Sequence, residues 1–397
     1  IEAKLQDRSW KQLLDHDWFR LVDQKIVMDL VAGLIKGELH SDVCQEVARK
    51  RTSSLWYEEL ATSYQALEYA ESLLADVAFW KPANGASAAD LYKRYETVEY
   101  RIDQNYRKFL ACFRKAGQPT YLRVLQEMVE NRYVNAFLTP HAQAWQARVD
   151  AMERWGIEGI LPQRKFFERK VQPYLDQARR KKLCVVVSDA LRYEVAEELK
   201  RRLNAENMYE AELESCLGCL PSYTQLGMAS LLPPGALEIM PEGSTTVKLG
   251  GSSTSGIEAR GQILSDRAGV RCTAIKFDDL FKLGKTESRE LIREHDLVYV
   301  YHNKIDAVGD KRNAEEQLAE AVDIAVDELI QVVKKLANGN ASNILVTADH
   351  GFQYQYSALE ESDFSSAKAE GREILKLDRR FVVGYGLQEA EAFRKWT

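Results

Sequence analysis

The stretch VVVSDALRYEVAEEL, Val185 to Leu199, places a run of β-branched residues directly before an acid and an amphipathic helix. The three valines predict a buried strand, and the residues that follow Ser188 and Asp189 repeat apolar side chains at helical spacing. Asp189 is therefore predicted at the carboxyl end of a strand, where a helix begins. Aspartate at this place is also a good helix N-cap, so capping is the alternative to a functional role.

Further strand-like runs alternate with helical stretches after Leu183, among them the helices predicted at Ile257–Arg267 and Asn313–Leu336. This alternation predicts an α/β domain with a mainly parallel sheet and helices on both faces. Ligands of such sheets bind at the carboxyl ends of the strands, which gives Asp189 a functional setting. The predicted strands are Leu183–Ser188, Ala211–Cys216, Thr245–Leu249, Val270–Phe277, Asp296–Tyr301, Asn343–Ala348 and Phe381–Tyr385.

The first part of the chain has a different pattern. Segments such as SSLWYEELATSYQALEYAESLLADVAFW (residues 53–80) repeat apolar and aromatic residues at three- and four-residue steps, which is typical of packed helices. We therefore predict an α-helical domain over 1–160. A basic stretch over 161–182 is predicted to be a connecting helix, and 183–397 the α/β domain.

Composition limits the classes of protein to consider. Hydrophobic residues make up 45% and charged residues 29% of the 397 positions, as in globular proteins of two or three domains. The net charge of −6 indicates no bulk affinity for nucleic acid. The sequence contains no run of 18 apolar residues, so we predict no membrane span. Six scattered cysteines favour a reducing cytoplasm. The start at Ile1, without a methionine, indicates a fragment of a longer protein.

Three more predicted strand ends carry polar groups. They are Thr224 in LPSYTQLGMASLL, then His302, Asp306 and Asp310 in DLVYVYHNKIDAVGD, then Asp349 and His350 in NILVTADHGF. Carboxylates that gather at one edge of a sheet repel one another unless cations neutralise them. A pair of divalent metal ions meets this need, and it would also clamp a phosphoryl group and turn the Thr224 hydroxyl into a nucleophile.

The segments SDALRYE, LPSYTQLGMASLLP, YVYHNKIDAVGD and VTADHGF, in this order, resemble the PglZ domain of the alkaline phosphatase superfamily, over residues 183–385. The resemblance implies two metal ions, usually zinc, around a Ser or Thr nucleophile. It assigns one metal to Asp189, Thr224, Asp349 and His350, with Thr224 as the nucleophile. It assigns the other to Asp306 and Asp310, where Asp replaces a usual His and favours Mn²⁺ or Mg²⁺ more than a His would.

The same resemblance implies a function. PglZ-like proteins belong to BREX-type phage-defence systems, beside a DNA methyltransferase and ATPase-like partners. We therefore expect a metal-dependent phosphatase, phosphodiesterase or nuclease, with DNA as a further candidate partner and no membrane contact. The superfamily's last metal ligand is a His downstream of the DHG motif, but no His follows His350 here. Either that ligand lies in a missing C-terminal portion, which we expect, or the site of Asp306 and Asp310 is incomplete. The alternative is a catalytically weak scaffold or regulatory subunit of the defence complex.

Single residues have alternatives too. Thr224 can cap its own helical turn, the Asp349 motif can be a plain turn, and Asp310 can be a solvated loop residue. Arg192 lies one turn after Asp189 and can approach a bound phosphate, or it can form a surface ion pair. His302 can contact substrate or hydrogen-bond inside the strand end. The Gly/Ser-rich LGGSSTSGIEARGQIL (residues 249–264) is predicted to be a flexible lid or loop.

Overall fold

A computed structural model describes residues 5–40, 42–83, 85–177, 182–240, 246–309, 317–354, 368–378 and 381–388. The chain forms two compact units, Ile1–Val149 and Asp150–Thr397. The domain limits predicted at 160 and 182 stay a prediction. Among the described residues, no helix is both long enough and apolar enough to cross a bilayer.

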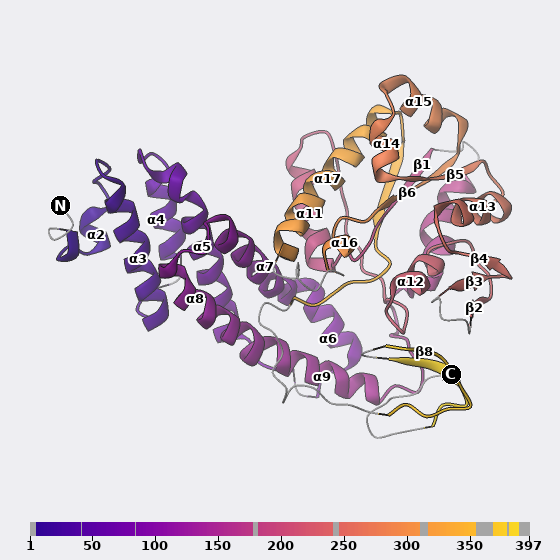
Figure 1. Ribbon diagram of the computed structural model, residues 1–397, viewed down its shortest axis with the longest axis horizontal. Coiled ribbons are helices and arrows are strands. Elements are labelled where there is room, and N and C mark those ends of the chain that lie inside the picture. Colours follow the sequence, from indigo (N-terminus) through magenta and orange to yellow (C-terminus); the bar gives the residue numbers. More distant parts are fainter. Residues whose placement is uncertain are drawn as a thin grey trace. The chain divides into compact units, whose positions relative to one another are not determined.

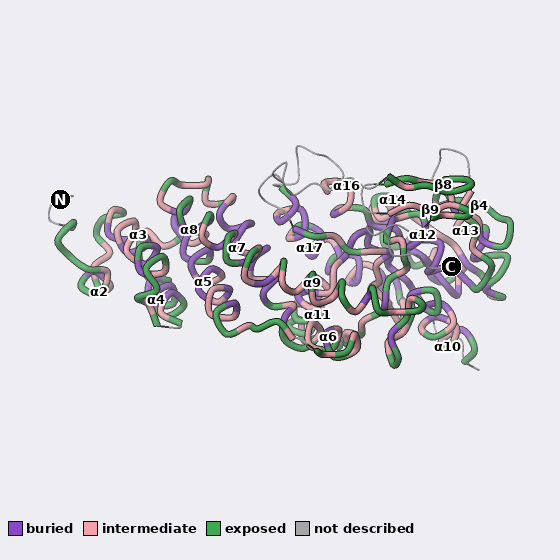
Figure 2. The backbone as a smooth tube through the Cα atoms, turned by 90° about the horizontal axis from the view of Figure 1, so that it is seen from below, coloured by how far each residue is buried: buried purple, intermediate pink, exposed green. Residues whose placement is uncertain are grey.

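The first unit is built of helices, as the periodicity predicts, and its described residues contain no strand (Figure 1). Its α-helices are α2 (Trp10–Leu13), α3 (Arg20–Lys36), α4 (Val43–Arg51), α5 (Tyr57–Phe79), α6 (Ala88–Arg94), α7 (Tyr100–Lys115), α8 (Thr120–Asn131) and α9 (Thr139–Asp150), with the π-helical turns η1 (Tyr95–Glu99) and η2 (Arg132–Leu138). Buried and exposed positions alternate along these helices (Figure 2). A buried ion pair joins α3 to α4, because both Nε and Nη2 of Arg51 donate to Asp23, at 2.8 and 2.7 Å.

The second unit contains a parallel sheet of four strands in the order β5-β6-β1-β7. The strands are β5 (Cys272–Lys276), β6 (Leu297–His302), β1 (Leu183–Ser188) and β7 (Asn343–Thr347). The two central strands, β6 and β1, are buried at every residue, which explains their continuous apolar sequences. This confirms the predicted α/β fold with a parallel sheet.

Helices cover both faces of this sheet (Figure 1). One face packs Val187 and Tyr301 against α12 (Thr224–Ser230) and α13 (Ile257–Arg267). Toward the other face lie α11 (Tyr193–Ala205) and α17 (Leu318–Asn338), which contact each other. The remaining helices of the unit are η3 (Gln163–Lys165), η4 (Phe167–Val171), α10 (Gln172–Leu175), α14 (Phe277–Lys282), α15 (Lys285–Glu294) and α16 (Asp306–Gly309).

Three predicted strands lie elsewhere. Residues 211–216 alternate in exposure as a strand would, but they form no strand, because only the next residue, Leu217, makes a bridge, to Pro162. The predicted run 245–249 contains β3 (Val247–Leu249), which belongs to a separate antiparallel sheet. Its neighbours are β2 (Leu237–Ile239) and β4 (Ser252–Ser253), and the run 381–385 contains β9 (Val382–Tyr385), which pairs with β8 (Glu373–Leu377).

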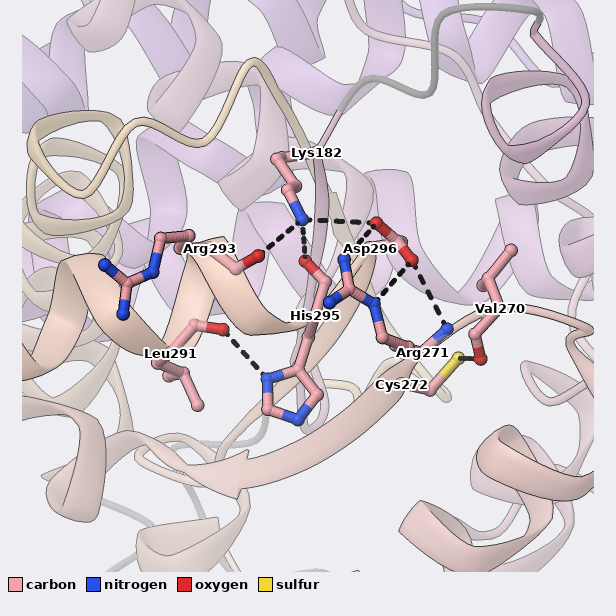
Figure 3. A network of polar contacts seen from close by, with 8 residues as sticks. All are labelled: Lys182, Val270, Arg271, Cys272, Leu291, Arg293, His295 and Asp296. Atoms are coloured by element: carbon pink, nitrogen blue, oxygen red, sulfur yellow. Dashed lines mark hydrogen bonds and ion pairs between the residues drawn. The ribbon is translucent and has the colours of Figure 1, made fainter.

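The amino end of the parallel sheet is closed by a polar network around Asp296, which immediately precedes β6 (Figure 3). Nζ of Lys182 donates to Oδ1 of Asp296 at 3.1 Å, and Nε and Nη2 of Arg271 reach the same carboxylate at 3.3 Å. Burial raises the pKa of Asp296, but the hydrogen bonds from Arg271 and Lys182 outweigh it and lower the pKa to about 2. This acid is therefore fully ionised and paired.

Candidate metal centre and nucleophile

The carboxyl end of the same sheet brings the predicted acids together. Ser188 at the end of β1 pairs with His302 at the end of β6, and the Asp189 N–H donates to the His302 carbonyl at 2.8 Å. On the other side β1 pairs with β7, so Asp349, two residues beyond β7, comes beside Asp189. Ala190 adopts a left-handed φ of 64°, and its N–H donates to Oδ1 of Asp349 at 3.1 Å.

Three metal-ligating side chains meet at this edge. One ligand atom from each of Asp189, Asp349 and His350 lies within 4.8 Å of the other two. Nε2 of His350 lies 3.5 Å from Oδ1 of Asp189 and 3.4 Å from Oδ2 of Asp349. Those two oxygens are buried, and neither has a hydrogen-bond partner within the described part of the chain. Buried oxygens without donors are what a bound cation would satisfy.

The electrostatics of Asp189 lead to the same conclusion. Burial, followed by the nearby charges of Asp349 and Asp306, raises the pKa of Asp189 to about 9, against a smaller lowering effect of Arg260. The carboxyl group therefore keeps its proton at neutral pH unless a cation compensates for its charge. A divalent ion between Asp189, Asp349 and His350 would remove both the repulsion and the desolvation cost, so the donor set fits a metal.

His350 is oriented as a ligand. Its Nδ1 lies 2.9 Å from the carbonyl oxygen of Gly351, and a carbonyl can only accept, so Nδ1 carries the proton. Nε2 consequently presents its lone pair toward the two carboxylates and toward the hydroxyl of Thr224, which lies 3.0 Å away. A histidine whose second nitrogen is held by a backbone carbonyl is the usual arrangement in metal sites.

Thr224 reaches the cluster because α12 packs directly on the end of β7. A Cβ built on Gly227 would lie 2.4 Å from the carbonyl oxygen of Asp349, so only glycine permits this approach. Gln163 fixes the same backbone, since its Nε2 donates to the Asp349 carbonyl at 2.6 Å and its Oε1 accepts from the Cys219 N–H at 3.1 Å. Thr224 itself is half-buried.

The other predicted site residues have different surroundings. Asp306 begins α16 and is close enough to raise the pKa of Asp189, whereas Asp310 lies outside the described residues. Arg192 precedes α11, and its guanidinium lies 4.9 Å from the ring centroid of Tyr354, just after the DHG motif. His302 is 2% exposed, and its ring nitrogens are hydrogen-bonded to Ser188 at the strand end and to Glu328; substrate contact by His302 stays a prediction.

Sequence reasoning missed three residues of the site region. Arg260 lies in the helix predicted over Ile257–Arg267, which is α13, but no pattern assigned it to the site; its guanidinium lies 4.5 Å from the ring centroid of Tyr301. Gln163 is distant in sequence, and no pattern marks it. Glu328 could have been noticed, because it is an acid at helical spacing from the buried Ala325 and Val332 of α17.

Comparison with known proteins defines the family. Residues 166–396 match the model of the "BREX system PglZ alkaline phosphatase-like domain". The chain is 37% identical over 383 residues to the alkaline phosphatase-like protein BrxZ of Escherichia coli O9:H4 (strain HS), and 32% identical over 389 residues to the alkaline phosphatase-like protein PglZ of Bacillus cereus (strain H3081.97). These matches cover 92% and 96% of the chain but 43% and 44% of the relatives. The chain therefore belongs to the PglZ family of BREX components, with an alkaline phosphatase-like domain.

Proposed function

We propose that this chain carries the catalytic site of a metal-dependent phosphoester hydrolase in a BREX-type phage-defence system. The observation that carries the proposal is the meeting of Asp189, Asp349 and His350 within 4.8 Å, with the Thr224 hydroxyl 3.0 Å from Nε2 of His350. Hydrolysis by the mechanism of the alkaline phosphatase superfamily requires at least a nucleophilic hydroxyl beside a cation site.

Asp189, Asp349 and His350 would hold one divalent ion, and Asp306 with Asp310 would contribute to a second. We expect Zn²⁺, or Mn²⁺ or Mg²⁺ given the oxygen-rich second set. When bound, such ions supply a lowered pKa for the Thr224 hydroxyl and positive charge for the phosphoryl oxygens. Membership of an alkaline phosphatase-like family and the partnerless buried oxygens of Asp189 and Asp349 support this assignment.

Thr224 would act as the nucleophile. Its Oγ1 would form a bond to phosphorus while the bond from phosphorus to the leaving oxygen breaks, and water would then displace Thr224 in a second step. Gly227 and Gln163 have a structural role, because they hold α12 and the Asp349 backbone in the positions from which this attack is possible. Arg260 and Arg192 would bind the non-bridging phosphoryl oxygens.

Arg260 suits this task because it is held in place. Its Nε donates to the Thr254 carbonyl at 3.0 Å, and its guanidinium lies over Tyr301, one residue before the end of β6. Tyr301 and Val187 form a register pair, so they share the face of the sheet on which Asp189 and Thr224 lie. Within the described residues, this positive charge therefore stands on the nucleophile's side of the sheet.

For the substrate we propose a phosphodiester of nucleic acid, because the family serves phage defence and the relatives are BREX proteins. The remaining BREX components, among them a methyltransferase and ATPase-like proteins, are the proposed partners. The alternative is a catalytically weak scaffold that keeps the metal centre for stability, and the experiment below separates the two.

Hydrolysis of p-nitrophenyl phosphate and bis(p-nitrophenyl) phosphate would be measured for the full chain with added Mn²⁺ or Zn²⁺. We expect Thr224→Ala to lower kcat by roughly 10³-fold or more, as for the loss of other covalent nucleophiles. Thr224→Ser should keep substantial activity, and Ser222→Ala, an exposed residue of the same loop, should change nothing. Equal rates for Thr224→Ala and the parent would refute the nucleophile, and metal binding without turnover would favour the scaffold.

A further inference from the structure

A chain of hydrogen bonds leads from β1 through β6 to α17, directly behind the site. Oγ of Ser188 lies 3.0 Å from Nδ1 of His302, and Nε2 of His302 lies 2.9 Å from Oε2 of Glu328. Ser188 is 0% and His302 2% exposed. The three groups come from sequence positions far apart, and the contact with Glu328 brings the middle of a helix to the sheet edge.

The chemistry of the three groups sets the direction of each hydrogen bond. An ionised carboxylate can only accept a hydrogen bond, so Nε2 of His302 carries a proton and donates it in a hydrogen bond to Glu328. When the ring carries a single proton, Nδ1 accepts a hydrogen bond from the Ser188 hydroxyl. Glu328 thereby selects one tautomer and one orientation of the His302 ring.

The same three residue types form a catalytic triad when the serine is accessible. Ser188 is enclosed at the end of a buried strand, and its side chain points to the face opposite Val187, so no substrate reaches it. This burial fits a structural role for Ser188, in which it helps to hold the site in place.

The backbone of His302 links this chain of hydrogen bonds to the candidate metal site. Its carbonyl accepts the N–H of Asp189 at 2.8 Å, and Ser188 and His302 form the last register pair of β1 and β6. Four residues after His302 the chain reaches Asp306, and Nζ of Lys304 in this connection lies 3.6 Å from Oε1 of Glu328. One glutamate therefore braces the two strand ends from which Asp189 and Asp306 emerge.

We propose that Glu328 is a positioning residue that acts through His302 to hold Asp189 and Asp306 in the geometry of the cation site. The proposal rests on the metal-dependent function proposed above. Removal of a carboxylate that orients the surroundings of a metal typically lowers metal affinity by about 10–100-fold, without changing the ligands themselves.

The chain offers a matched control next to it. Asp327 precedes Glu328 on the same helix, but its side chain is 56% exposed and pairs with Arg202 at 2.5 Å, away from His302. Asp327→Asn and Glu328→Gln remove the same charge from the same turn of α17. A difference between them therefore reports the contact with His302 and not the net charge or the helix.

The experiment is a titration of the full chain with Co²⁺, followed by visible absorption, which reports both the affinity and the ligand geometry. We expect Glu328→Ala to weaken Co²⁺ binding by about 10–100-fold and to alter the spectrum. Glu328→Gln, which keeps an accepting oxygen, should recover part of the affinity, and Asp327→Asn should match the parent. Metal-free melting curves show whether each variant folds, and Glu328→Gln decides the question if the alanine variant does not.

A double-mutant cycle tests whether Glu328 acts through His302. In a His302→Gln background, Glu328→Ala should cost far less affinity than in the parent, because the link is already broken. Parent-like Co²⁺ binding by Glu328→Ala, or additive effects in the cycle, would overturn the positioning role while the proposed function stands. Absence of Co²⁺ binding by the parent would overturn the proposed function, and the positioning role with it.

Discussion

The two ends of one parallel sheet treat a buried aspartate in opposite ways. Asp296 at the amino end and Asp189 at the carboxyl end are 7% and 4% exposed, so both residues are buried. Asp296 receives hydrogen bonds from Lys182 and Arg271 and has a pKa of about 2, whereas Asp189 faces Asp349 and has a pKa of about 9. Burial raises the pKa of both acids, but only Asp296 has cationic donors that outweigh this effect, whereas the charges of Asp349 and Asp306 add to it at Asp189.

The difference indicates what each end is for. The amino end is satisfied by the chain's own cations and serves stability. The carboxyl end leaves two buried carboxylate oxygens without donors. This lowers the free energy of unfolding of the metal-free chain, and a ligand that binds the folded state would raise it again. Buried acids that lack donors at a strand end are the arrangement that a cation site would require.

The largest effect expected from this difference between the two ends of the sheet is that of Asp189→Asn. The amide is neutral without taking up a proton, so the metal-free protein no longer bears the cost of burying this acid and should gain roughly 1–3 kcal/mol in its free energy of unfolding. The same change removes a ligand, so stabilisation by Mn²⁺ or Zn²⁺ should disappear. Urea unfolding with and without metal measures both effects, and a loss of metal-free stability would contradict the account.

At the amino end, Asp296→Asn should change the free energy of unfolding in the opposite direction. It leaves Lys182 and Arg271 without their carboxylate, so the free energy of unfolding should fall by about 1–3 kcal/mol. Metal affinity should not change, because the site lies at the other end of the strands. The same urea series provides the measurement, and reduced metal binding in this variant would show that the two ends are not independent.

The two acids also predict opposite pH dependences. The pKa of Asp189 is higher in the folded chain than its ordinary 3.8, so its contribution to metal-free stability is complete below about pH 4 and is lost as the pH rises toward 9. The pKa of Asp296 is lower than 3.8, so its contribution is complete above that pH and is lost as the pH falls toward 2.

Unfolding curves of the parent, Asp189→Asn and Asp296→Asn across this pH range measure each contribution by difference. Added Mn²⁺ should reverse the slope that Asp189 causes, because the cation replaces the proton and binds more tightly as the pH rises. A parent slope that survives unchanged in Asp189→Asn would assign the pH dependence to another group.

The smallest expected effect is that of Arg271→Gln. The Arg271 side chain is 64% exposed, so solvent screens its contact with Asp296, and Lys182 still pairs with the acid. A slight decrease in melting temperature, well below that of Asp296→Asn, is the expected result. A decrease as large as that of Asp296→Asn would mean that Arg271 alone neutralises the acid.

Local sequence patterns predict the parts of this molecule that local physics determines. Buried parallel strands are continuous apolar runs, so β1, β6 and β7 were predicted within one residue of their limits. The rule that strand carboxyl ends carry ligands placed Asp189, Asp349 and His350 at one edge, and the structure brings them together. Thr224 reaches the same edge at the start of α12, without the strand that was predicted before it. The metal they would bind stays a prediction.

Long-range pairing explains the errors and omissions. Residues 211–216 have the alternation of a strand but no neighbouring strand edge, a fact that depends on the rest of the fold. Gln163 contacts Asp349 from 186 residues away, and Glu328 reaches His302 from another layer. Such contacts leave no local pattern, except that an acid on the buried side of a helix, like Glu328, requires a partner.

The most direct test of the central claim is anomalous diffraction from crystals of this chain grown with Mn²⁺. The account predicts a peak within bonding distance of the Asp189 and Asp349 carboxylates and Nε2 of His350, with Oγ1 of Thr224 beside it, at a site that Asp189→Asn abolishes. Fully ordered crystals of the parent with no peak at this edge of the sheet, or with the ion bound elsewhere, would contradict it.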